Sequence, residues 1–405
     1  MNFIAPVLYL LTTYTIYKKI GTFFCLSVYV WLLHTISMTC FWIKADFLSG
    51  FDSEFTYFAL AIMYFTLVLI TLPLVKLEKS NITIKSLKSI SSSKFKRLKF
   101  VCYILIGLSL YSIVFFSINL PKVFALDVKA VRDGHVIFYE SSIYSKLAIL
   151  GAFSSVFCIY FYYYLSILDT LPRIRKLLLF SSISFVLYTL NVAGRDGIVI
   201  WGLSFMAGLF FFYRFLKKEL ISSIFRTLLK VSIVVVPVLV FITTSRFSGN
   251  SNDNSEIESI LSYAGQSLPN LSYTIDLTNK LGFRSGDGQI PIALLQPLTG
   301  KSDENRHEKI GDLMTYGFKS NQFKSYVGYF YPAYSFPILI IFILLFIFVI
   351  RVCSTRYIGS IDFVGFLPGF TWYMIPIVGI FYFYYGELIG NVFLLLPFLI
   401  KKYLK

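Results

Sequence analysis

The segment Phe55–Val75 reads FTYFALAIMYFTLVLITLPLV and contains no charged residue. About twenty apolar residues in a helix are long enough to cross a hydrocarbon layer of roughly 30 Å. In such a layer a spanning segment must satisfy its backbone hydrogen bonds internally, which a helix does. The segment therefore predicts a membrane-spanning helix.

Apolar runs of this kind recur along the whole chain. Hydrophobic residues make up 57% of the 405 residues and aromatic residues 19%, with a mean hydropathy of +0.72. This composition excludes a water-soluble globule. We predict an all-α, polytopic integral membrane protein, a single membrane domain over residues 1–405, with about eleven transmembrane helices. The predicted spans are Asn2–Tyr17, Ile20–Ile43, Phe55–Val75, Phe100–Leu120, Leu147–Leu168, Leu177–Val192, Ile198–Leu216, Leu228–Thr244, Ser335–Ile350, Phe363–Phe383 and Leu388–Ile400.

Lys and Arg collect in alternate loops, which predicts the orientation because positive loops are retained on the cytoplasmic side. Segment 76–99 is then a basic cytoplasmic loop, and segment 245–334 is one large periplasmic loop between the eighth and ninth spans. The C-terminal tail is cytoplasmic, and the N-terminus lies on the far side. The net charge of +16 is thus largely a topology signal, and we expect no nucleic-acid partner.

The first polar motif that calls for an explanation is 191–197, Asn-Val-Ala-Gly-Arg-Asp-Gly, between the sixth and seventh spans. Glycines on both sides of Arg195 and Asp196 permit a tight turn and close approach of a ligand. A charge at the membrane edge is costly unless it is paired or faces a wet cavity. Arg195 is therefore a candidate binding residue; the alternative is that Arg195 and Asp196 pair and simply end two helices.

Arg246 and Arg284 are two further candidates in the predicted periplasmic loop. Arg246 follows the eighth span directly, and Arg284 stands between glycines in Gly-Phe-Arg-Ser-Gly. Each guanidinium offers a planar fork of donors suited to phosphate. Arg246 is equally compatible with snorkelling into lipid headgroups.

His307 lies in the one part of this loop where a histidine and several carboxylates cluster. The segment 300–308 reads GKSDENRHE and contains Asp303, Glu304 and Glu308. His307 can accept a proton near neutral pH, and a desolvated carboxylate can do so as well. The alternative is a solvated helix or turn whose charges pair with one another.

The sequence shows no pattern for a cofactor or a metal. The five cysteines fall in apolar runs or in a turn, without the spacing of a zinc site. We find no glycine-rich phosphate loop and no serine elbow. We therefore expect neither a cofactor nor a bound metal.

This layout resembles the bacterial O-antigen polymerase family, which joins oligosaccharide repeat units. The resemblance rests on the number of spans, the Gly-Arg-Asp-Gly motif at 194–197, Arg246 at the start of the large loop, and the return segment 326–334, YVGYFYPAY. It implies a metal-independent glycosyltransferase in the bacterial cytoplasmic (inner) membrane. Its substrates would be undecaprenyl-pyrophosphate-linked oligosaccharides, and membrane lipids and a chain-length regulator protein would be partners.

The resemblance also suggests roles for the candidate residues. Arg195, Arg246 and Arg284 would hold the pyrophosphate, where fixed positive charge stabilises the negative charge that develops as the glycosidic bond breaks. His307, or the carboxylate of Asp303 or Glu308, would take the proton of the acceptor hydroxyl.

Two other functions remain open on the sequence. A metal-dependent polyprenyl-phosphate-sugar glycosyltransferase would place acidic ligands in an early outward loop, where this chain has Asp52 and Glu54. A flippase or other transporter of lipid-linked oligosaccharides would distribute charge along its central spans, and charge is scarce in the spans of this chain.

Overall fold

The computed structural model describes residues 3–43, 55–79, 92–124, 142–191, 194, 196–226, 229, 233, 261, 264–281, 325–354, 363–380 and 388–404. Every regular element among these residues is a helix. Five helical segments in this part of the chain are long and apolar enough to cross a membrane: Leu26–Ile43, Thr56–Lys79, Ser92–Pro121, Ile143–Leu168 and Asp196–Phe215. Two shorter apolar helices are Leu339–Cys353 and Gly365–Val378. The predicted class, an all-helical multi-pass membrane protein, is confirmed at this level.

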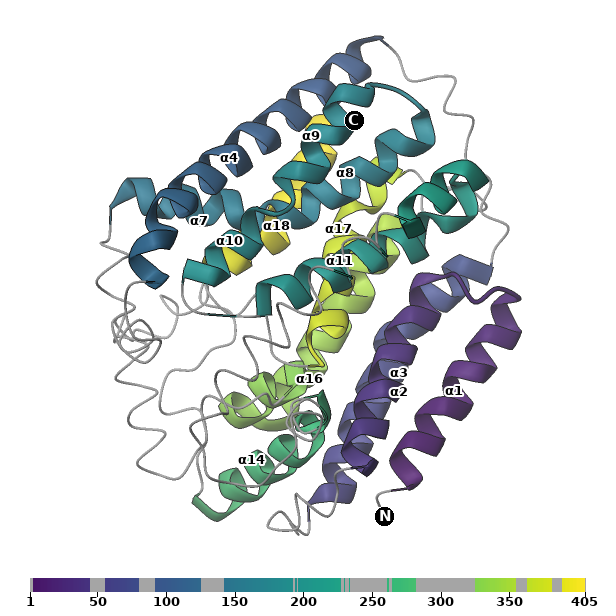
Figure 1. The fold of residues 1–405 in the computed structure, drawn as a ribbon. Helices are drawn as coiled ribbons and strands as arrows, with labels where there is room; N and C mark the ends of the chain where they lie inside the picture. The colour runs from purple at the N-terminus through teal and green to yellow at the C-terminus, as the bar shows by residue number, and fades with distance from the viewer. Residues whose placement is uncertain are drawn as a thin grey trace. The chain divides into compact units, whose positions relative to one another are not determined.

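The chain forms two compact units, which Figure 1 shows with their helix labels. The first unit comprises Met1–Ile82, Phe241–Gly359 and Trp372–Asn391, and the second comprises Thr83–Val240, Ser360–Thr371 and Val392–Lys405. The helices of the first unit are α1 (Ile4–Ile20), α2 (Leu26–Ile43), α3 (Thr56–Lys79), α14 (Ser267–Leu281) and α16 (Ser325–Ser354). Those of the second are α4 (Ser92–Phe124), α7 (Ile143–Phe153), α8 (Ser155–Leu168), α9 (Pro172–Ser181), α10 (Ser184–Asn191) and α11 (Asp196–Phe212), followed by the short η3 (Tyr213–Phe215). Helices α17 (Phe363–Val378) and α18 (Leu388–Leu404) contribute residues to both units.

Several boundaries differ from the predicted spans. Helix α1 runs to Ile20 and stops at Gly21, whose left-handed φ of +80° places its N–H 2.8 Å from the Tyr17 carbonyl oxygen. Glycine adopts this conformation without strain, which makes it a common helix terminator. The second span therefore begins at Leu26, not Ile20. The predicted eighth span, Leu228–Thr244, lies almost entirely outside the described residues.

The fifth and sixth predicted spans are each built from two helices. A break at Ser154 separates α7 from α8, and a turn at residues 182–183 separates α9 from α10. The basic segment 76–99 is helical at both ends, because α3 continues to Lys79 and α4 already begins at Ser92.

In the first unit, a buried carboxylate joins the end of α3 to the start of α2. Glu78 is 5% exposed, and its Oε1 accepts a hydrogen bond from the Leu26 N–H at 2.7 Å. Its Oε2 accepts from the Ser27 N–H at 3.2 Å and from the Ser27 hydroxyl. The first N–H groups of a helix have no partner within the helix, and the positive end of the helix dipole favours an anion. Glu78 thus supplies the N-terminal cap of α2 from a distant part of the chain.

Helix α16 in the same unit is bent. The rings of Tyr326 and Phe342 lie 6.3 Å apart between centroids, although sixteen residues of a straight helix would separate them by about 24 Å. The sequence between them contains Pro332 and Pro337, and proline inside a helix removes a backbone hydrogen bond and kinks the axis. The start of α16 is held by a hydrogen bond of 2.9 Å from the Tyr326 N–H to the Gly379 carbonyl oxygen at the end of α17.

In the second unit, α4 and α7 approach closely at Gly151. A Cβ at this position would overlap the carbonyl oxygen of Leu108 and lie 2.9 Å from the Ser112 Cβ. Beside it, the Ser154 hydroxyl donates to the Gly151 carbonyl oxygen at 2.6 Å and accepts from the Ser109 hydroxyl at 2.7 Å. Small residues allow helix backbones to approach in this way in membrane proteins, where packing rather than hydrophobic burial holds helices together.

We expect Glu78→Ala to lower the free energy of unfolding by about 1–3 kcal/mol, because it leaves two buried backbone N–H groups without an acceptor. Glu78→Gln should lose less, since an amide oxygen still accepts one bond. Thermal unfolding of the purified protein in detergent measures both. Lys79→Ala, at the exposed neighbouring position, is the control; an equal loss there would contradict the capping role.

We expect opposite effects from two glycine substitutions near the α4–α7 contact. Gly151→Ala should destabilise the protein by about 1–3 kcal/mol through overpacking. Gly107→Ala, on α4 with nothing within 4 Å of the added Cβ, should be neutral or stabilising by about 0.5 kcal/mol because alanine favours helix. The same unfolding measurement compares them, and similar values for the two variants would refute the close contact.

Candidate functional site

The turn between α10 and α11 is the one predicted site segment for which the structure describes the framework. Asn191, Gly194, Asp196 and Gly197 are described, whereas Arg195 lies outside the described residues. The turn begins at the last residue of α10 and ends at the first residue of α11.

Asn191 anchors the turn to a neighbouring helix. The side chain is 3% exposed, and its Nδ2 donates to the carbonyl oxygens of Phe116 on α4, at 3.0 Å, and of Leu187 on α10, at 2.9 Å. Both amide hydrogens thus find acceptors inside the helix bundle. A buried amide that ties two helices together holds the end of α10 in one place, since breaking either bond would leave a buried polar group without a partner.

Gly194 and Gly197 let the chain reverse against Thr189. The Gly194 N–H donates to the Thr189 carbonyl oxygen at 2.8 Å, and a Cβ on Gly194 would lie 2.5 Å from Asp196 Oδ1. A Cβ on Gly197 would overlap Thr189 Oγ1 and lie 3.0 Å from the Phe185 carbonyl oxygen. Any larger residue would push α11 away from α10.

The turn leads into the N-terminus of α11, the end at which the helix dipole provides partial positive charge. Asp196 lies in the first turn of this helix, a position that the dipole favours for a carboxylate. An anion bound here would need more positive charge than the helix alone provides. The guanidinium of the preceding residue in the sequence, Arg195, is a suitable source of that charge.

The opposite end of the second unit carries the basic residues. Asp169, at the end of α8, forms an ion pair of 2.7 Å with Lys217 and one of 3.5 Å with Arg175. The hydrogen bond and charge of Lys217 lower the pKa of Asp169, and Asp169 raises the pKa of Lys217 in turn. Since α11 has 17 residues, about 25 Å separates this end from the turn at Gly194.

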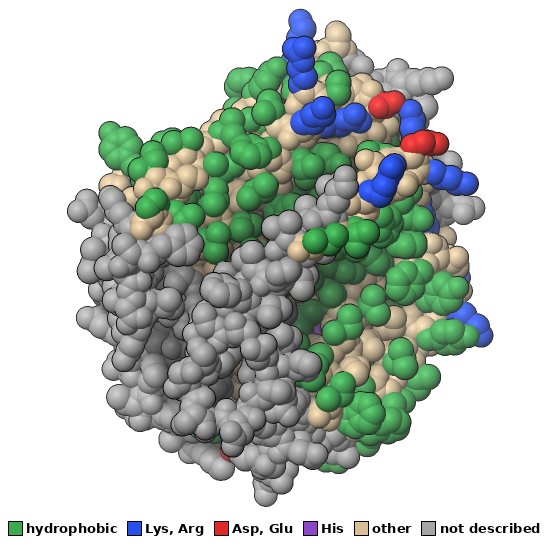
Figure 2. Space-filling model, in the orientation of Figure 1, with side chains coloured by type: hydrophobic (Ala, Val, Ile, Leu, Met, Phe, Trp, Pro, Cys, Tyr) green, Lys and Arg blue, Asp and Glu red, His purple; other side chains and the backbone are tan. Residues whose placement is uncertain are grey.

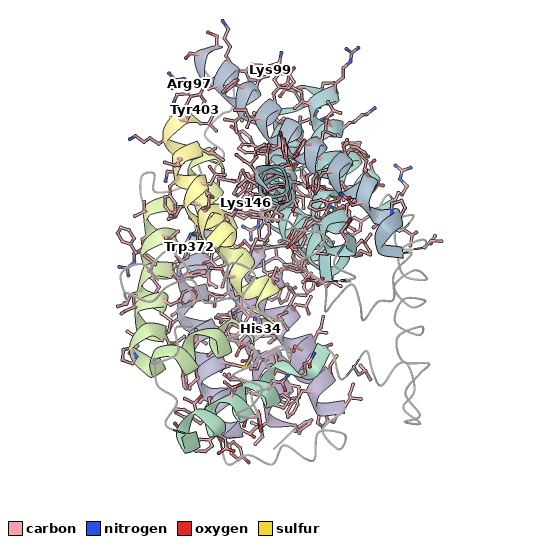
Figure 3. The ribbon with its side chains drawn as sticks, turned by 90° about the vertical axis from the view of Figure 1, so that its left-hand side faces the viewer. His34, Arg97, Lys99, Lys146, Trp372 and Tyr403 are labelled. Atoms are coloured by element: carbon pink, nitrogen blue, oxygen red, sulfur yellow. The ribbon has the colours of Figure 1, made fainter. Side chains whose placement is uncertain are left out.

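Helix α18 ends in the same basic region as α4 begins. Arg97 Nη1 donates to the Tyr403 carbonyl oxygen at 3.2 Å, and its guanidinium lies 5.8 Å from the centre of the Tyr403 ring. Figure 3 shows Arg97, Lys99 and Tyr403 together at these helix ends. In Figure 2, Lys and Arg side chains lie at helix ends while hydrophobic side chains cover the helix flanks. Charge is thus confined to the ends, as expected for helices that cross an apolar layer.

The other predicted site residues are not described. Arg246, Arg284, Asp303, His307 and Glu308 all lie outside the described residues, as do Asp52 and Glu54. Their proximity to one another and to Arg195 therefore stays a prediction. Among the residues that the structure does describe, no three His, Cys, Asp or Glu side chains are grouped so that they could hold a metal ion.

The segment predicted as one large loop, 245–334, contains helical structure that the sequence reasoning missed. Helix α14 packs against α2, α3 and α16 in the first unit. The hydroxyls of Ser272 and Thr56 are 3.0 Å apart, and Ser37 donates to the Ala264 carbonyl oxygen at 2.8 Å. Residues 325–334, also assigned to the loop, form the start of α16.

The apolar residues of α14 have a spacing from which this helix could have been predicted. Leu268, Leu271 and Ile275 are each 0% exposed and recur at the spacing of one helix face. The loop is thus not wholly a free extramembrane segment, because one of its helices is part of a helix bundle.

Comparison of the chain with protein-family models, with curated proteins and with solved structures finds no match.

We expect Gly197→Ala to destabilise the second unit by about 1–3 kcal/mol, because the added methyl group overlaps Thr189. The double variant Gly197→Ala/Thr189→Ala should recover part of the loss by removing the overlapping Oγ1. Thermal unfolding in detergent measures both variants. Gly202→Ala, on the same helix with nothing within 4 Å of its Cβ, is the control and should be neutral; no difference between the two glycine positions would contradict the close α10–α11 contact.

Proposed function

We propose that this chain is a polymerase that joins undecaprenyl-pyrophosphate-linked oligosaccharide repeat units into O-antigen or a related surface polysaccharide. The reaction takes place at the periplasmic face of the bacterial cytoplasmic membrane. The substrates are lipid-linked saccharides, and a chain-length regulator is a further partner. The multi-pass helical fold agrees with a substrate whose polyprenyl chain lies in the bilayer.

The chemistry is a glycosyl transfer without a nucleotide sugar. The bond between the anomeric carbon of the growing chain and its lipid pyrophosphate breaks, and the pyrophosphate leaves with the bonding electrons. A hydroxyl oxygen of the next repeat unit forms the new glycosidic bond. Its proton passes to a base, for which His307, Asp303 and Glu308 are the candidates. Negative charge therefore accumulates on the leaving pyrophosphate, where fixed positive charge accelerates the reaction.

The observation that carries the proposal is the turn at 191–197. Asn191 ties this turn to α4, and Gly194 and Gly197 hold it against Thr189. In the sequence, Arg195 directly precedes Asp196, the first residue of α11. An arginine on a rigid turn can present its donors to a phosphate with little loss of conformational entropy. Arg246 and Arg284 are proposed to complete the site.

The orientation of the turn follows from the charge distribution. Lys217, Arg175 and Arg97 lie at the opposite end of the second unit. By the positive-inside rule that end is cytoplasmic, which places the turn at the periplasmic face. The proposed pyrophosphate site is therefore on the side where exported lipid-linked repeat units are presented.

We expect Arg195→Ala and Arg246→Ala each to slow polymerisation by about 10²–10³-fold, the usual effect of removing one transition-state donor. Cells carrying either variant should display single repeat units in place of long chains. Arg195→Lys should recover little activity, because a point charge cannot reproduce the planar fork. The length distribution of the polysaccharide on a gel, with membrane levels of the protein measured in parallel, provides the readout.

Arg173→Ala is the matched control, because Arg173 is an exposed arginine at the basic end, and it should leave long chains unchanged. Normal long chains in the Arg195→Ala strain would refute the pyrophosphate role of that residue. If deletion of the whole gene removes even single repeat units from the surface, the chain is a transporter instead. Loss of activity in purified membranes after treatment with a strong chelator would indicate the metal-dependent transferase.

A further inference from the structure

Four buried polar atoms of the first unit have no hydrogen-bond partner among the described residues. One is the hydroxyl of Ser325, and the other three belong to ring side chains. They are the hydroxyl of Tyr9 on α1, Nδ1 of His34 on α2 and the hydroxyl of Tyr326 on α16. The three side chains are 0%, 1% and 1% exposed. Leaving such groups unpaired in an apolar interior costs about 1–3 kcal/mol each, so their occurrence in one place calls for a common explanation.

The three rings are neighbours. Tyr9 stacks on His34 with 6.3 Å between ring centroids and an interplanar angle of 19°. Tyr326 meets His34 edge-on, with 6.5 Å between centroids and an angle of 86°. His34, labelled in Figure 3, therefore lies between two tyrosines that come from different helices. The unpaired groups form one cluster.

The hydrogen bond of His34 defines what this cluster can bind. Its Nε2 lies 3.0 Å from the carbonyl oxygen of Pro376 on α17. A carbonyl oxygen only accepts, so Nε2 carries the proton and donates. A neutral imidazole has one N–H, and the neutral form suits a site without a charged partner. Nδ1 is then a bare acceptor that requires a donor, while each tyrosine hydroxyl can donate and accept.

Two polar side chains that pack against Tyr9 already have hydrogen-bond partners. Trp31 Nε1 donates to Thr71 Oγ1 at 3.0 Å, and the Tyr64 hydroxyl is 2.8 Å from Thr12 Oγ1. The rings of Trp31 and Tyr64 each pack against Tyr9 with 5.5 Å between centroids. These neighbours enclose the cluster without supplying the donor that Nδ1 requires.

We propose that Tyr9, His34 and Tyr326 form a binding site for one neutral hydroxyl group, supplied by a water molecule or by a sugar. The hydroxyl donates to His34 Nδ1 and accepts from the tyrosine hydroxyls, which satisfies all three groups at once. The site connects α1 and α2 to the start of α16. This helix begins at the end of the long segment that follows Thr244. It does not depend on the function proposed above.

Nitrogen NMR of His34 tests the site directly. Replacing His135 and His307 by Gln leaves His34 as the sole histidine of the chain. In the purified protein labelled with ¹⁵N, we expect Nδ1 to resonate as an unprotonated nitrogen that accepts a hydrogen bond. In the Tyr9→Phe/Tyr326→Phe variant, the chemical shift of Nδ1 should move towards that of an unprotonated nitrogen without a hydrogen bond. A bare Nδ1 in the parent protein in both lauryldimethylamine oxide and dodecyl maltoside would overturn the proposal.

A double-mutant cycle tests whether the two tyrosines share one ligand. Tyr9→Phe and Tyr326→Phe should each lower the folding equilibrium constant about fivefold, and together by clearly less than the product of the two effects. Tyr14→Phe, on the exposed face of the same helix, should change it less than about twofold and combine multiplicatively with Tyr326→Phe. Multiplicative effects for Tyr9 and Tyr326, or stabilisation by either change, would overturn the shared site.

The detergent distinguishes the source of the hydroxyl. In lauryldimethylamine oxide without glycerol, water is the one small hydroxyl donor present. A hydrogen-bonded Nδ1 in that detergent assigns the site to water. If Nδ1 becomes hydrogen-bonded only after exchange into dodecyl maltoside, the site is assigned to a sugar hydroxyl. A bare nitrogen in both detergents contradicts the site altogether.

Discussion

The requirement that every polar group in an apolar layer find a partner within the protein governs this structure. The cap that Glu78 provides for α2 is its clearest instance, because the first N–H groups of a helix have no partner within the helix and those of Leu26 and Ser27 are buried. A carboxylate there is stabilised by the helix dipole and by several donors at once. These hydrogen bonds also fix the position of α3 along α2. The need of the α2 backbone N–H groups for an acceptor thus determines how the two helices pack.

The second unit meets a different constraint, which is close packing. Hydrophobic burial drives helices together only weakly when their surroundings are themselves apolar, so contact depends on shape. Gly151 and Gly197 are positions in this unit where a missing Cβ brings helices close together. Gly151 brings α4 against α7, and Gly197 brings α10 against α11 at the turn proposed to carry the pyrophosphate site. The framework of the site is thus a consequence of helix packing.

At the candidate site, some features could be predicted from the sequence and others could not. A Cβ on Gly194 or Gly197 would meet neighbouring atoms, and glycine in a sequence is a local indication of such close approach. The anchoring of that turn by Asn191 to Phe116 joins residues seventy-five positions apart, and nothing local encodes it. Whether Arg246, Arg284 and His307 approach the turn depends on contacts of the same long-range kind.

The sequence by itself determined the class of the protein, its apolar helices and the confinement of charge to their ends, because hydropathy and the cost of burying charge act on each segment separately. It also marked most helix boundaries, although α2 begins later and α16 earlier than the apolar runs suggest. Only the tertiary structure decided that Glu78 caps α2, that α14 joins the first bundle, that α16 bends, and that Tyr9, His34 and Tyr326 meet. The period of α14 and the prolines of α16 are visible in the sequence, but the partners that these helices and side chains meet come from distant parts of the chain, and no local pattern identifies them.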